Sequence, residues 1–343
     1  MRVMITGCSK HSKELIDCLK QNEDGRRVEV TAVNMDSNKL LRHGPDYCHV
    51  VPPITDERYI DILLAICKEH DINIIIPYIT AELELMARNK YIFEREGIKV
   101  SVADAETVER LNNKAIFYEF FSDYMPPQIE VKTRLQAIRA LEVMKQGNKK
   151  TCCKISGKCG GTGFCILDEE KCHDISLFNR CGVNRYISRE ELLKILDTGK
   201  HSVILQEYIE GTDYSVCVLA NHGKVERMVG YAGYDMEFGA VVNGQILYNQ
   251  EAYQIVEKIV SETGFDGNAC FDFILDGPDP EFAKPYLLEC NPRINASIGF
   301  CWNAGVNLVY LRCKQLLGEE IGPHEPVIYG MRMQKYYESE YYI

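Results

Sequence analysis

Residues 286–301 read YLLECNPRINASIGFC, and the interpretation of the whole chain starts from this stretch. Its first residues are apolar, as expected of a short buried strand. Pro292 ends that strand, because proline has no amide hydrogen to give to a sheet. Side chains two residues apart on a strand share a face, so Glu289, Asn291 and Arg293 should project together. A carboxylate and an amide oxygen suit Mg²⁺, and a neighbouring guanidinium suits a phosphoryl group or an oxyanion.

A second carboxylate, Asp272, lies upstream in the sequence ACFDFIL. It sits between two phenylalanines, so the alternation puts it on the opposite face from both rings. If the two strands pair as a hairpin across the turn DGPDPEFAKP, Asp272 and Glu289 can bridge the same metal ions. A carboxylate at a strand end can also cap a loop or pair with Arg293. The coincidence of these groups with Asn291 favours the metal site.

Composition limits the classes of function. The chain has 343 residues, which is long enough for two or three domains. Its 46% hydrophobic and 26% charged residues are typical of a soluble globular protein. A net charge of −11 argues against nucleic acid and against an anionic membrane as the main partner, since both require a basic surface.

Cysteine usage and the N-terminal sequence indicate a cytoplasmic protein. The 15 cysteines include no C-x₂-C pair and no histidine partner at zinc-finger spacing, so reduced thiols are expected instead of a zinc site or a disulfide framework. The first residues, MRVMITGCSKHSK, lead directly into a strand without a signal-peptide core. No apolar run approaches the roughly 20 residues that a membrane span needs.

Residues 1–105 predict strands that alternate with helices, and therefore a parallel, Rossmann-like sheet. The expected strands are RVMITG, VEVTAVNM, INIIIPY and IKVSV. The first turn has the single glycine Gly7 and lacks the G-x-G-x-x-G fingerprint, although Asp36 could hold a ribose. A dinucleotide-dependent oxidoreductase that uses NAD is therefore kept as an alternative. Ligands bind at the carboxyl edge of such sheets, which makes candidate substrate contacts of Tyr78, Thr80 and Glu82.

The middle of the chain predicts a helix and a small subdomain. The sequence DAETVERLNNKAIFYEFF predicts one helix, capped by Asp104, with Lys114 near its middle. Residues of about 122–203 form the subdomain, in which Lys154 ends a strand before the glycine-rich turn Ser156–Gly163. The amides of such a turn can fold over a phosphate, although a plain hairpin turn has the same composition. It is not a Walker loop, because no G-K-[ST] precedes a helix.

The remainder of the chain predicts strands and two helices. SVILQEYI and DYSVCVL are expected strands, QEAYQIVEKIVSETGF is a helix that leads into the Asp272 strand, and NLVYLRCKQLLGEE is a closing helix. The tyrosine-rich tail, residues 326–343, either packs as a strand or stays loose.

Several of these motifs, in this order, resemble the ATP-grasp superfamily, which includes the carbamoyl phosphate synthetase large subunit and other carboxylate–amine ligases. FDFILD, a short turn and LLECNPRI are similar to its metal-binding end, and the resemblance covers about residues 115–310. It implies a mixed α/β and α+β fold: a Rossmann-like pre-ATP-grasp domain (1–105), a part with a lid subdomain (106–203), and an antiparallel-sheet subdomain for nucleotide and metal (204–325).

The resemblance also implies roles for individual residues. Asp272, Glu289 and Asn291 would hold two Mg²⁺ ions, which Mn²⁺ could replace, and Arg293 would be catalytic. The adenine hinge would use main-chain groups, and an acidic residue would hold the ribose. The implied ATP-binding residues are Lys114, Lys154, Ser156, Gly160, Gly161, Gly163, Glu207, Tyr208, Ile209 and Asp213.

The implied activity is that of an ATP-dependent ligase. It would activate a small-molecule carboxylate as an acyl phosphate for attack by an amine or a thiol. The identity of both substrates stays open, as does a homodimer. Lys158 and Cys159 interrupt the glycine run, so an ATP-binding regulatory protein without turnover is kept as a further alternative.

Overall fold

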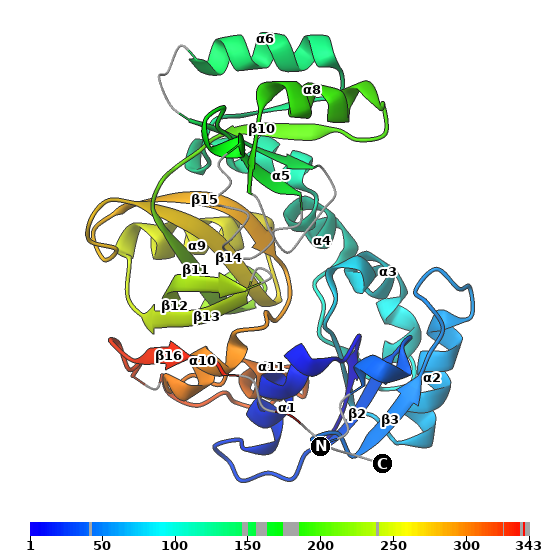
Figure 1. The fold of residues 1–343 in the computed structure, drawn as a ribbon. Coiled ribbons are helices and arrows are strands. Elements are labelled where there is room, and N and C mark those ends of the chain that lie inside the picture. Colours follow the sequence, from blue (N-terminus) through cyan, green and yellow to red (C-terminus); the bar gives the residue numbers. More distant parts are fainter. Residues whose placement is uncertain are drawn as a thin grey trace.

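The computed structural model describes residues 1–40, 43–145, 150–155, 163–173, 185–237, 240–324, 326–336 and 339. Within these residues the strands form two five-stranded sheets and one six-stranded sheet. The sheets are separate layers in Figure 1: the N-terminal one at the lower right, the small one at the top and the six-stranded one at the left.

The N-terminal sheet has the strand order β3-β2-β1-β4-β5, and all of its strand pairs are parallel, which confirms the predicted Rossmann-like sheet. Its inner strand β4 is buried along its whole length, as its continuous apolar run predicts. The edge strand β3 was not predicted, because it is mostly exposed and has no apolar run. The elements are β1 (Arg2–Thr6), α1 (Lys13–Lys20), β2 (Glu29–Asn34), β3 (Tyr47–Val50), α2 (Tyr59–Glu69), β4 (Ile74–Pro77), α3 (Leu83–Glu94) and β5 (Lys99–Val100).

Two helices follow, where the sequence predicts one. Asp104 caps α4 (Ala105–Asn112) as expected, by accepting a hydrogen bond from the Thr107 amide. The helix then ends, because Asn113 is extended at φ −83° and ψ 111° and its side chain caps α5 (Lys114–Phe121). The prediction that Lys114 lies near the middle of a helix is therefore wrong: it is the first residue of the second helix.

The small sheet has the order β6-β10-β7-β8-β9. Strand β10 pairs with β6 on one edge and with β7 on the other, so all of it, through Glu207, belongs to this sheet. This sheet thus extends past residue 203, the expected end of the small subdomain, to Glu207. The elements are β6 (Gln128–Val131), α6 (Arg134–Lys145), β7 (Thr151–Ile155), β8 (Phe164–Leu167), β9 (Tyr186–Ile187), α8 (Arg189–Asp197) and β10 (Val203–Glu207).

The six-stranded sheet has the order β15-β14-β11-β12-β13-β16 and is antiparallel, as predicted. The last strand comes from the tyrosine-rich tail, which therefore joins this sheet instead of forming a separate segment. The elements are β11 (Thr212–Asn221), β12 (Lys224–Glu237), β13 (Ala240–Ile246), α9 (Gln250–Thr263), β14 (Gly267–Asp276), β15 (Lys284–Asn291), α10 (Ile298–Asn303), α11 (Leu308–Leu316) and β16 (Arg332–Gln334).

Polar contacts join the N-terminal domain to the C-terminal part. The Glu14 carboxylate on α1 accepts a hydrogen bond from the Gly299 amide on α10 at 3.2 Å. Arg26 pairs with Glu319 at 2.8 Å. A shared apolar cluster that includes residues of β1, α1, α10 and α11 lies behind these contacts. The carboxyl edge of the parallel sheet is thereby held close to the end of β15.

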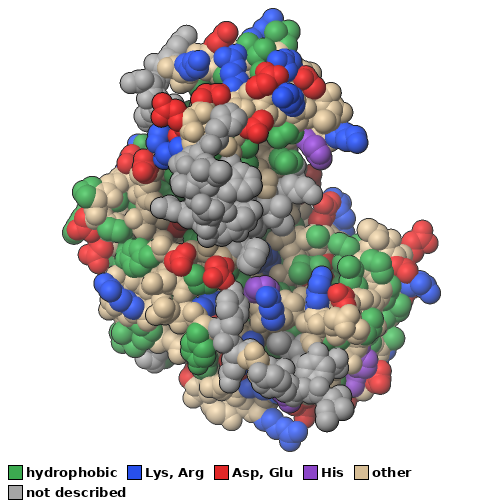
Figure 2. All heavy atoms as spheres, in the orientation of Figure 1, with side chains coloured by type: hydrophobic (Ala, Val, Ile, Leu, Met, Phe, Trp, Pro, Cys, Tyr) green, Lys and Arg blue, Asp and Glu red, His purple; other side chains and the backbone are tan. Residues whose placement is uncertain are grey.

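The surface is mixed in charge. Figure 2 shows acidic and basic side chains side by side on the face drawn, especially over the small sheet and its helices. No disulfide joins the cysteines within the described part of the chain. Among the helices that the structure describes, none combines the length and the apolar character needed to cross a membrane.

Candidate active site

The predicted metal ligands meet on one face of the six-stranded sheet. Strands β14 and β15 form the predicted hairpin, in which Asp272 lies directly opposite Glu289. A bulge follows Asp272 in this pairing, and bulges re-aim the side chains beside them. The Asn291 Nδ2 atom donates to Asp272 Oδ2 at 2.9 Å and lies 3.5 Å from Glu289 Oε1. The three side chains therefore form one cluster.

Ser215 belongs to the same cluster and was not predicted. It lies opposite Asp272 on the other side of β14, in β11, and its hydroxyl donates to Asp272 Oδ1 at 2.7 Å. The Cys270 thiol lies 3.5 Å from the same oxygen. The one sequence signal for Ser215 is its spacing of two from Asp213, which puts both on one face of the strand.

Burial, and then the charge of Glu289, raises the pKa of Asp272 to about 6. Burial acts in the same direction on Glu289, but the ammonium groups of Lys114 and Lys154 outweigh it and hold the pKa of Glu289 below its ordinary value. Burial lowers the pKa of Lys154. Two facing carboxylates on a half-buried face favour a bound cation, because a cation relieves their repulsion.

The donor set fits Mg²⁺. Carboxylate and amide oxygens are the ligands that this ion prefers in proteins. The Asn291 amide turns its nitrogen toward both carboxylates, so a half-turn of the amide would present its oxygen instead. In this structure the carboxylates face two donors, the neutral Asn291 amide nitrogen and the Lys114 ammonium. Lys114 Nζ lies 2.8 Å from Glu289 Oε2.

A small cavity adjoins this cluster, between the small sheet and the six-stranded sheet. It contains both predicted phosphate-binding lysines, one from the start of α5 and one from β7. Its lining residues are Lys114, Phe117, Met125, Gln128, Lys154, Ile204, Leu288 and Glu289. The fold thus brings Lys114, Lys154 and Glu289 together.

Part of the predicted lid lies outside the described residues, including Ser156, Gly160 and Gly161. Gly163 is described and has φ +79°, a conformation that other residues rarely adopt. Its carbonyl accepts a hydrogen bond from the Ile155 amide at 3.1 Å. This contact joins the two ends of the glycine-rich segment.

The predicted adenine hinge lies where the chain passes from the small sheet to the six-stranded sheet. The Glu207 amide donates to the Pro127 carbonyl at 3.0 Å, and the Tyr208 amide donates to the Lys150 carbonyl at 2.8 Å. Ile209 follows directly. Asp213 is exposed near the start of β11, on the same face as the Asp272 partner Ser215.

Arg293 connects the cluster to the N-terminal domain. Its Nε atom donates to the Thr80 hydroxyl at 2.9 Å, and its Nη1 atom donates to the Ile294 carbonyl at 2.9 Å. The predicted catalytic residue and one predicted substrate contact are therefore direct neighbours, although they are 213 residues apart in the chain.

The other two predicted substrate contacts do not reach a surface. The Glu82 side chain is 0% exposed, and Tyr78 is 7% exposed with its hydroxyl donating to the His11 carbonyl. The Glu82 carboxylate accepts hydrogen bonds from Thr6, Tyr59, Tyr78 and Ile79. The Glu82 carboxylate thus orders the turn that presents Thr80. Substrate contact by Glu82 and Tyr78 stays a prediction, and burial restricts it for both side chains.

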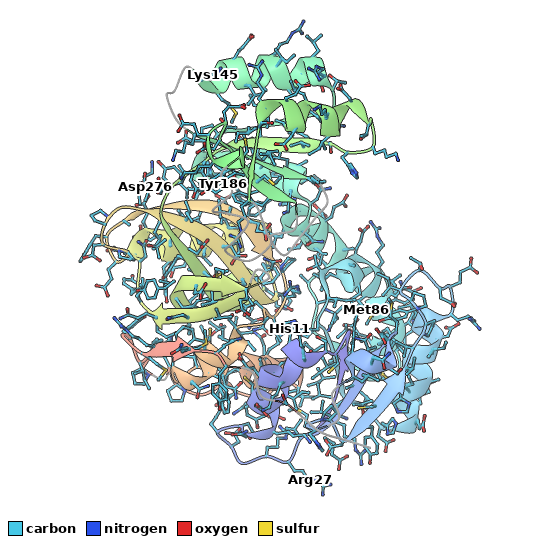
Figure 3. All side chains as sticks on the ribbon, viewed as in Figure 1. His11, Arg27, Met86, Lys145, Tyr186 and Asp276 are labelled. Carbon is cyan, nitrogen blue, oxygen red and sulfur yellow. The ribbon has the colours of Figure 1, made fainter. Side chains whose placement is uncertain are left out.

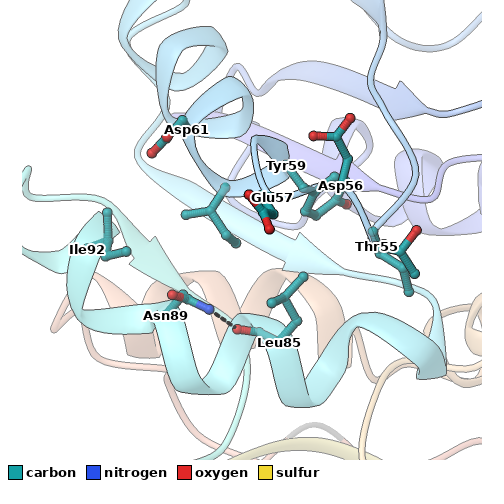
Figure 4. Close-up of a pocket in the computed structure, with 10 residues that line it drawn as sticks. Thr55, Asp56, Glu57, Tyr59, Asp61, Leu85, Asn89 and Ile92 are labelled. Carbon is teal, nitrogen blue, oxygen red and sulfur yellow. Dashed lines mark hydrogen bonds between the residues drawn. The ribbon is translucent and has the colours of Figure 1, made fainter.

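A second depression, of about 440 Å³, lies elsewhere on the N-terminal domain. Figure 4 shows its lining, which includes Asp56, Glu57, Asp61 and Asn89. None of the carboxylate-cluster or cavity residues lines it. In Figure 3, His11 marks the side of the N-terminal domain that faces the six-stranded sheet, whereas Asp276 marks the remote end of β14.

The described site sets paired carboxylates on an antiparallel sheet next to a small sheet that carries Lys154. Residues 200–338 match the family described as ATP-grasp in the biosynthetic pathway with Ter operon. Residues 3–101 match the PylC-like N-terminal domain. The resemblance found in the sequence is thus confirmed by matches to two family models, one in the N-terminal part of the chain and one in the C-terminal part.

The chain is similar to the C-terminal section of the carbamoyl phosphate synthase large chain of Methanopyrus kandleri, with 24% identity over 85% of this chain and 51% of that protein. It thus spans about half the length of this relative. The fold is similar to N5-carboxyaminoimidazole synthetase of Staphylococcus aureus with ADP (TM-score 0.66, 14% identity, 95% of this chain and 80% of that chain). It is also similar to L-amino acid ligase of Bacillus licheniformis (TM-score 0.62, 16% identity, 92% of this chain and 74% of that chain).

Proposed function

We propose that this chain is an ATP-dependent ligase that activates a small-molecule carboxylate as an acyl phosphate for attack by an amine or a thiol. The observation that carries the proposal is the facing pair Asp272 and Glu289, bridged by Asn291 and ion-paired through Lys114. A cluster of two carboxylates, an amide and a lysine beside a cavity is suited to a metal–nucleotide complex. The residues of this cluster and its cavity lie outside the N-terminal sheet, which is where an NAD site would lie.

Asp272, Glu289 and Asn291 would hold two Mg²⁺ ions, or Mn²⁺ in their place. When bound, these ions would neutralise charge on the phosphates of ATP. Glu289 would exchange its contact with Lys114 for a cation, and the Lys114 ammonium would then be available to a phosphate oxygen. Lys154 faces the same cavity and would hold a second phosphate oxygen.

The nucleotide would lie between the two sheets. Its adenine would contact main-chain groups of Glu207, Tyr208 and Ile209. The amides of Glu207 and Tyr208 already donate hydrogen bonds to carbonyls of the small subdomain. Asp213 would accept hydrogen bonds from the ribose. The segment Ser156–Gly163 would cover the phosphates and exclude water, so that the acyl phosphate meets its nucleophile before it hydrolyses.

In the first step a carboxylate oxygen of the substrate would attack the γ-phosphorus, and the bond from that phosphorus to the ADP oxygen would break. In the second, the nucleophile would add to the carbonyl carbon, lose a proton, and expel inorganic phosphate. Arg293 would stabilise the negative oxygens of both steps. Its bond to Thr80 would fix the guanidinium against the N-terminal domain, which makes that domain's edge a wall of the substrate site.

The relatives support small-molecule ligase chemistry. One is named an L-amino acid ligase, and another is a synthetase whose structure contains ADP. For this chain the acid, the nucleophile and a homodimeric state are open to experiment.

The test is an assay of ADP release with Mg²⁺ and ATP over a panel of carboxylates, each with and without amines and thiols. Hydroxylamine added in place of the nucleophile should trap the activated acyl group as a hydroxamate. Asp272→Asn should abolish release, whereas Asp276→Asn, at the exposed end of the same strand, should not. Binding of NAD(H) without ATP would favour the oxidoreductase. Tight ATP binding without release over the whole panel would favour a regulatory protein.

A further inference from the structure

A second group of metal-ligating side chains lies on the N-terminal domain, away from the carboxylate cluster. His49 on β3 and His70, the residue after α2, place their Nε2 atoms 2.7 Å apart. Glu69, the last residue of α2, adds a carboxylate, and the ligand atoms of all three lie within 4.8 Å of one another. Strand and helix lie side by side in Figure 1. The fold therefore builds a two-imidazole, one-carboxylate set from two elements.

The imidazole rings are held in position by their neighbours. Tyr47 and His49 are two residues apart on β3, so their side chains project from the same face. The Tyr47 ring stacks on His70 with centroids 4.3 Å apart and an angle of 32° between the planes. The two imidazoles meet edge to face, at 4.8 Å and 60°, which directs their Nε2 atoms toward each other.

The end of α2 is also fixed to the sheet. Asp71 follows the helix with φ +47°, which turns the chain sharply back toward β4. Its carboxylate pairs with Arg2 at 3.0 Å, and Arg2 also pairs with Glu29 on β2 at 3.1 Å. Glu69 and His70 are thus presented by an element anchored to two strands, and ligands on rigid elements need little reorganisation to bind.

The chemistry of the set selects the ion. Imidazole nitrogen and carboxylate oxygen bind Zn²⁺ at about 2.0–2.2 Å, and two histidines with one carboxylate are a known zinc ligand combination with a position left for water. Two nitrogens on one tetrahedral ion lie about 3.3 Å apart, so the present 2.7 Å contact would have to open by about 0.6 Å. Small side-chain rotations suffice for that. Imidazole-rich sets disfavour Mg²⁺, which requires oxygen ligands.

We propose that His49, Glu69 and His70 bind a divalent transition-metal ion, with Zn²⁺ as the expected ion. The ion would tie the edge strand β3 to α2. Among the described strands, β3 pairs with β2 alone, so such a link would strengthen its attachment to the sheet. The site is independent of the proposed ligase activity, since none of its residues belongs to the carboxylate cluster or its cavity.

The test is titration of the chelator-treated full chain with Zn²⁺, by calorimetry and by competition with a chromophoric chelator. Excess Mg²⁺ is present so that the carboxylate cluster is occupied. Loss of a group that merely orients a ligand costs about 10–100-fold in affinity, so loss of a ligand should cost at least as much. His49→Asn and His70→Asn should therefore weaken Zn²⁺ binding at least about tenfold. His201→Asn, at an exposed position on the small subdomain, should leave it unchanged.

A second readout separates a metal site from a simple hydrogen bond between two histidines. Zn²⁺ should raise the unfolding temperature of the wild-type chain but not of His49→Asn, and Co²⁺ should give a visible spectrum of low-coordinate geometry only in the wild type. If His49→Asn fails to fold, Glu69→Gln, at an exposed position, replaces it in both measurements. A wild-type chain that binds no Zn²⁺, or variants that bind it equally well, would overturn the proposal.

Discussion

Asp272 on β14 and Glu289 on β15 lie directly opposite each other in one antiparallel strand pair, so that two carboxylates share a half-buried face of the sheet. Their environments differ. Glu289 has the Lys114 ammonium at 2.8 Å, whereas the donors that the described residues offer to Asp272 are neutral, from Ser215, Cys270 and Asn291. The repulsion between the two carboxylates therefore makes ionisation less favourable mainly at Asp272, and the effect on stability can be measured.

Asp272→Asn should change how stability depends on pH. The folded-state pKa of about 6 exceeds the unfolded value of about 3.9, so between these values the folded state binds more protons than the unfolded one. The contribution of protonated Asp272 to the free energy of unfolding of the wild type is thus lost as the pH rises through this window. The free energy of unfolding of Asp272→Asn relative to wild type should rise from near zero at pH 4 to on the order of 2 kcal/mol at pH 7.

Urea denaturation in EDTA at a series of pH values would measure this difference. Asp276→Asn, at an exposed position, serves as the control and should follow the wild type. Mg²⁺ should stabilise the wild type more than Asp272→Asn, because binding to the folded state alone adds to stability. If the difference in free energy of unfolding between Asp272→Asn and the wild type did not vary with pH, the folded-state pKa of Asp272 would not be raised.

Arg293→Ala should slow turnover, on the proposed ligase mechanism. Loss of a donor to a developing oxyanion typically lowers kcat by about 10²–10³-fold. ATP affinity should change little, because Arg293 points to Thr80 and lies outside the lysine-lined cavity. Thr80→Val should have a smaller effect, of about tenfold, since it removes one hydrogen bond that positions the guanidinium. Steady-state kinetics with an ATP-binding titration checks both, and near-normal turnover in Arg293→Ala would remove this residue from the mechanism.

Lys114→Met should weaken ATP binding about ten- to hundredfold, because a hydrogen bond to a charged group contributes roughly 1.5–3 kcal/mol. Calorimetric titration with ATP and Mg²⁺ measures the change. Lys224→Met provides a matched control, since Lys224 also pairs with a glutamate but is exposed on a remote strand end. Equal affinities for the two variants would contradict a phosphate contact by Lys114.

Glu82→Ala should destabilise the N-terminal domain by about 3 kcal/mol or more, because four donors, three of them buried, would lose their acceptor. Glu84→Ala should cost only about 0.5 kcal/mol, because its ion pair with Arg88 is exposed. Chemical denaturation compares the two. If Glu82→Ala were as stable as Glu84→Ala, the turn that carries Thr80 would have to be ordered by something other than the Glu82 carboxylate.

Elements with a clear hydrophobic period could be predicted from the sequence. The buried run of β4, the amphipathic helix α9 and the alternation around Asp272 all specify their own conformation locally. Elements with weak local signals could not. The exposed edge strand β3 has no apolar run, and the helix break at Asn113 depends on one capping side chain within a continuous helical pattern.

The alternation of residues in a strand is enough to predict which side chains share a face, so Glu289 and Asn291 project together wherever that strand packs. The residues that lie across from them depend on how the folded elements pack together. The register that sets Ser215 beside Asp272, the 2.8 Å pair of Lys114 with Glu289, and the contact of Arg293 with Thr80 all join residues far apart in the chain. Such pairings depend on how separate elements dock, and docking is set by the burial of the whole core, which no local sequence pattern encodes.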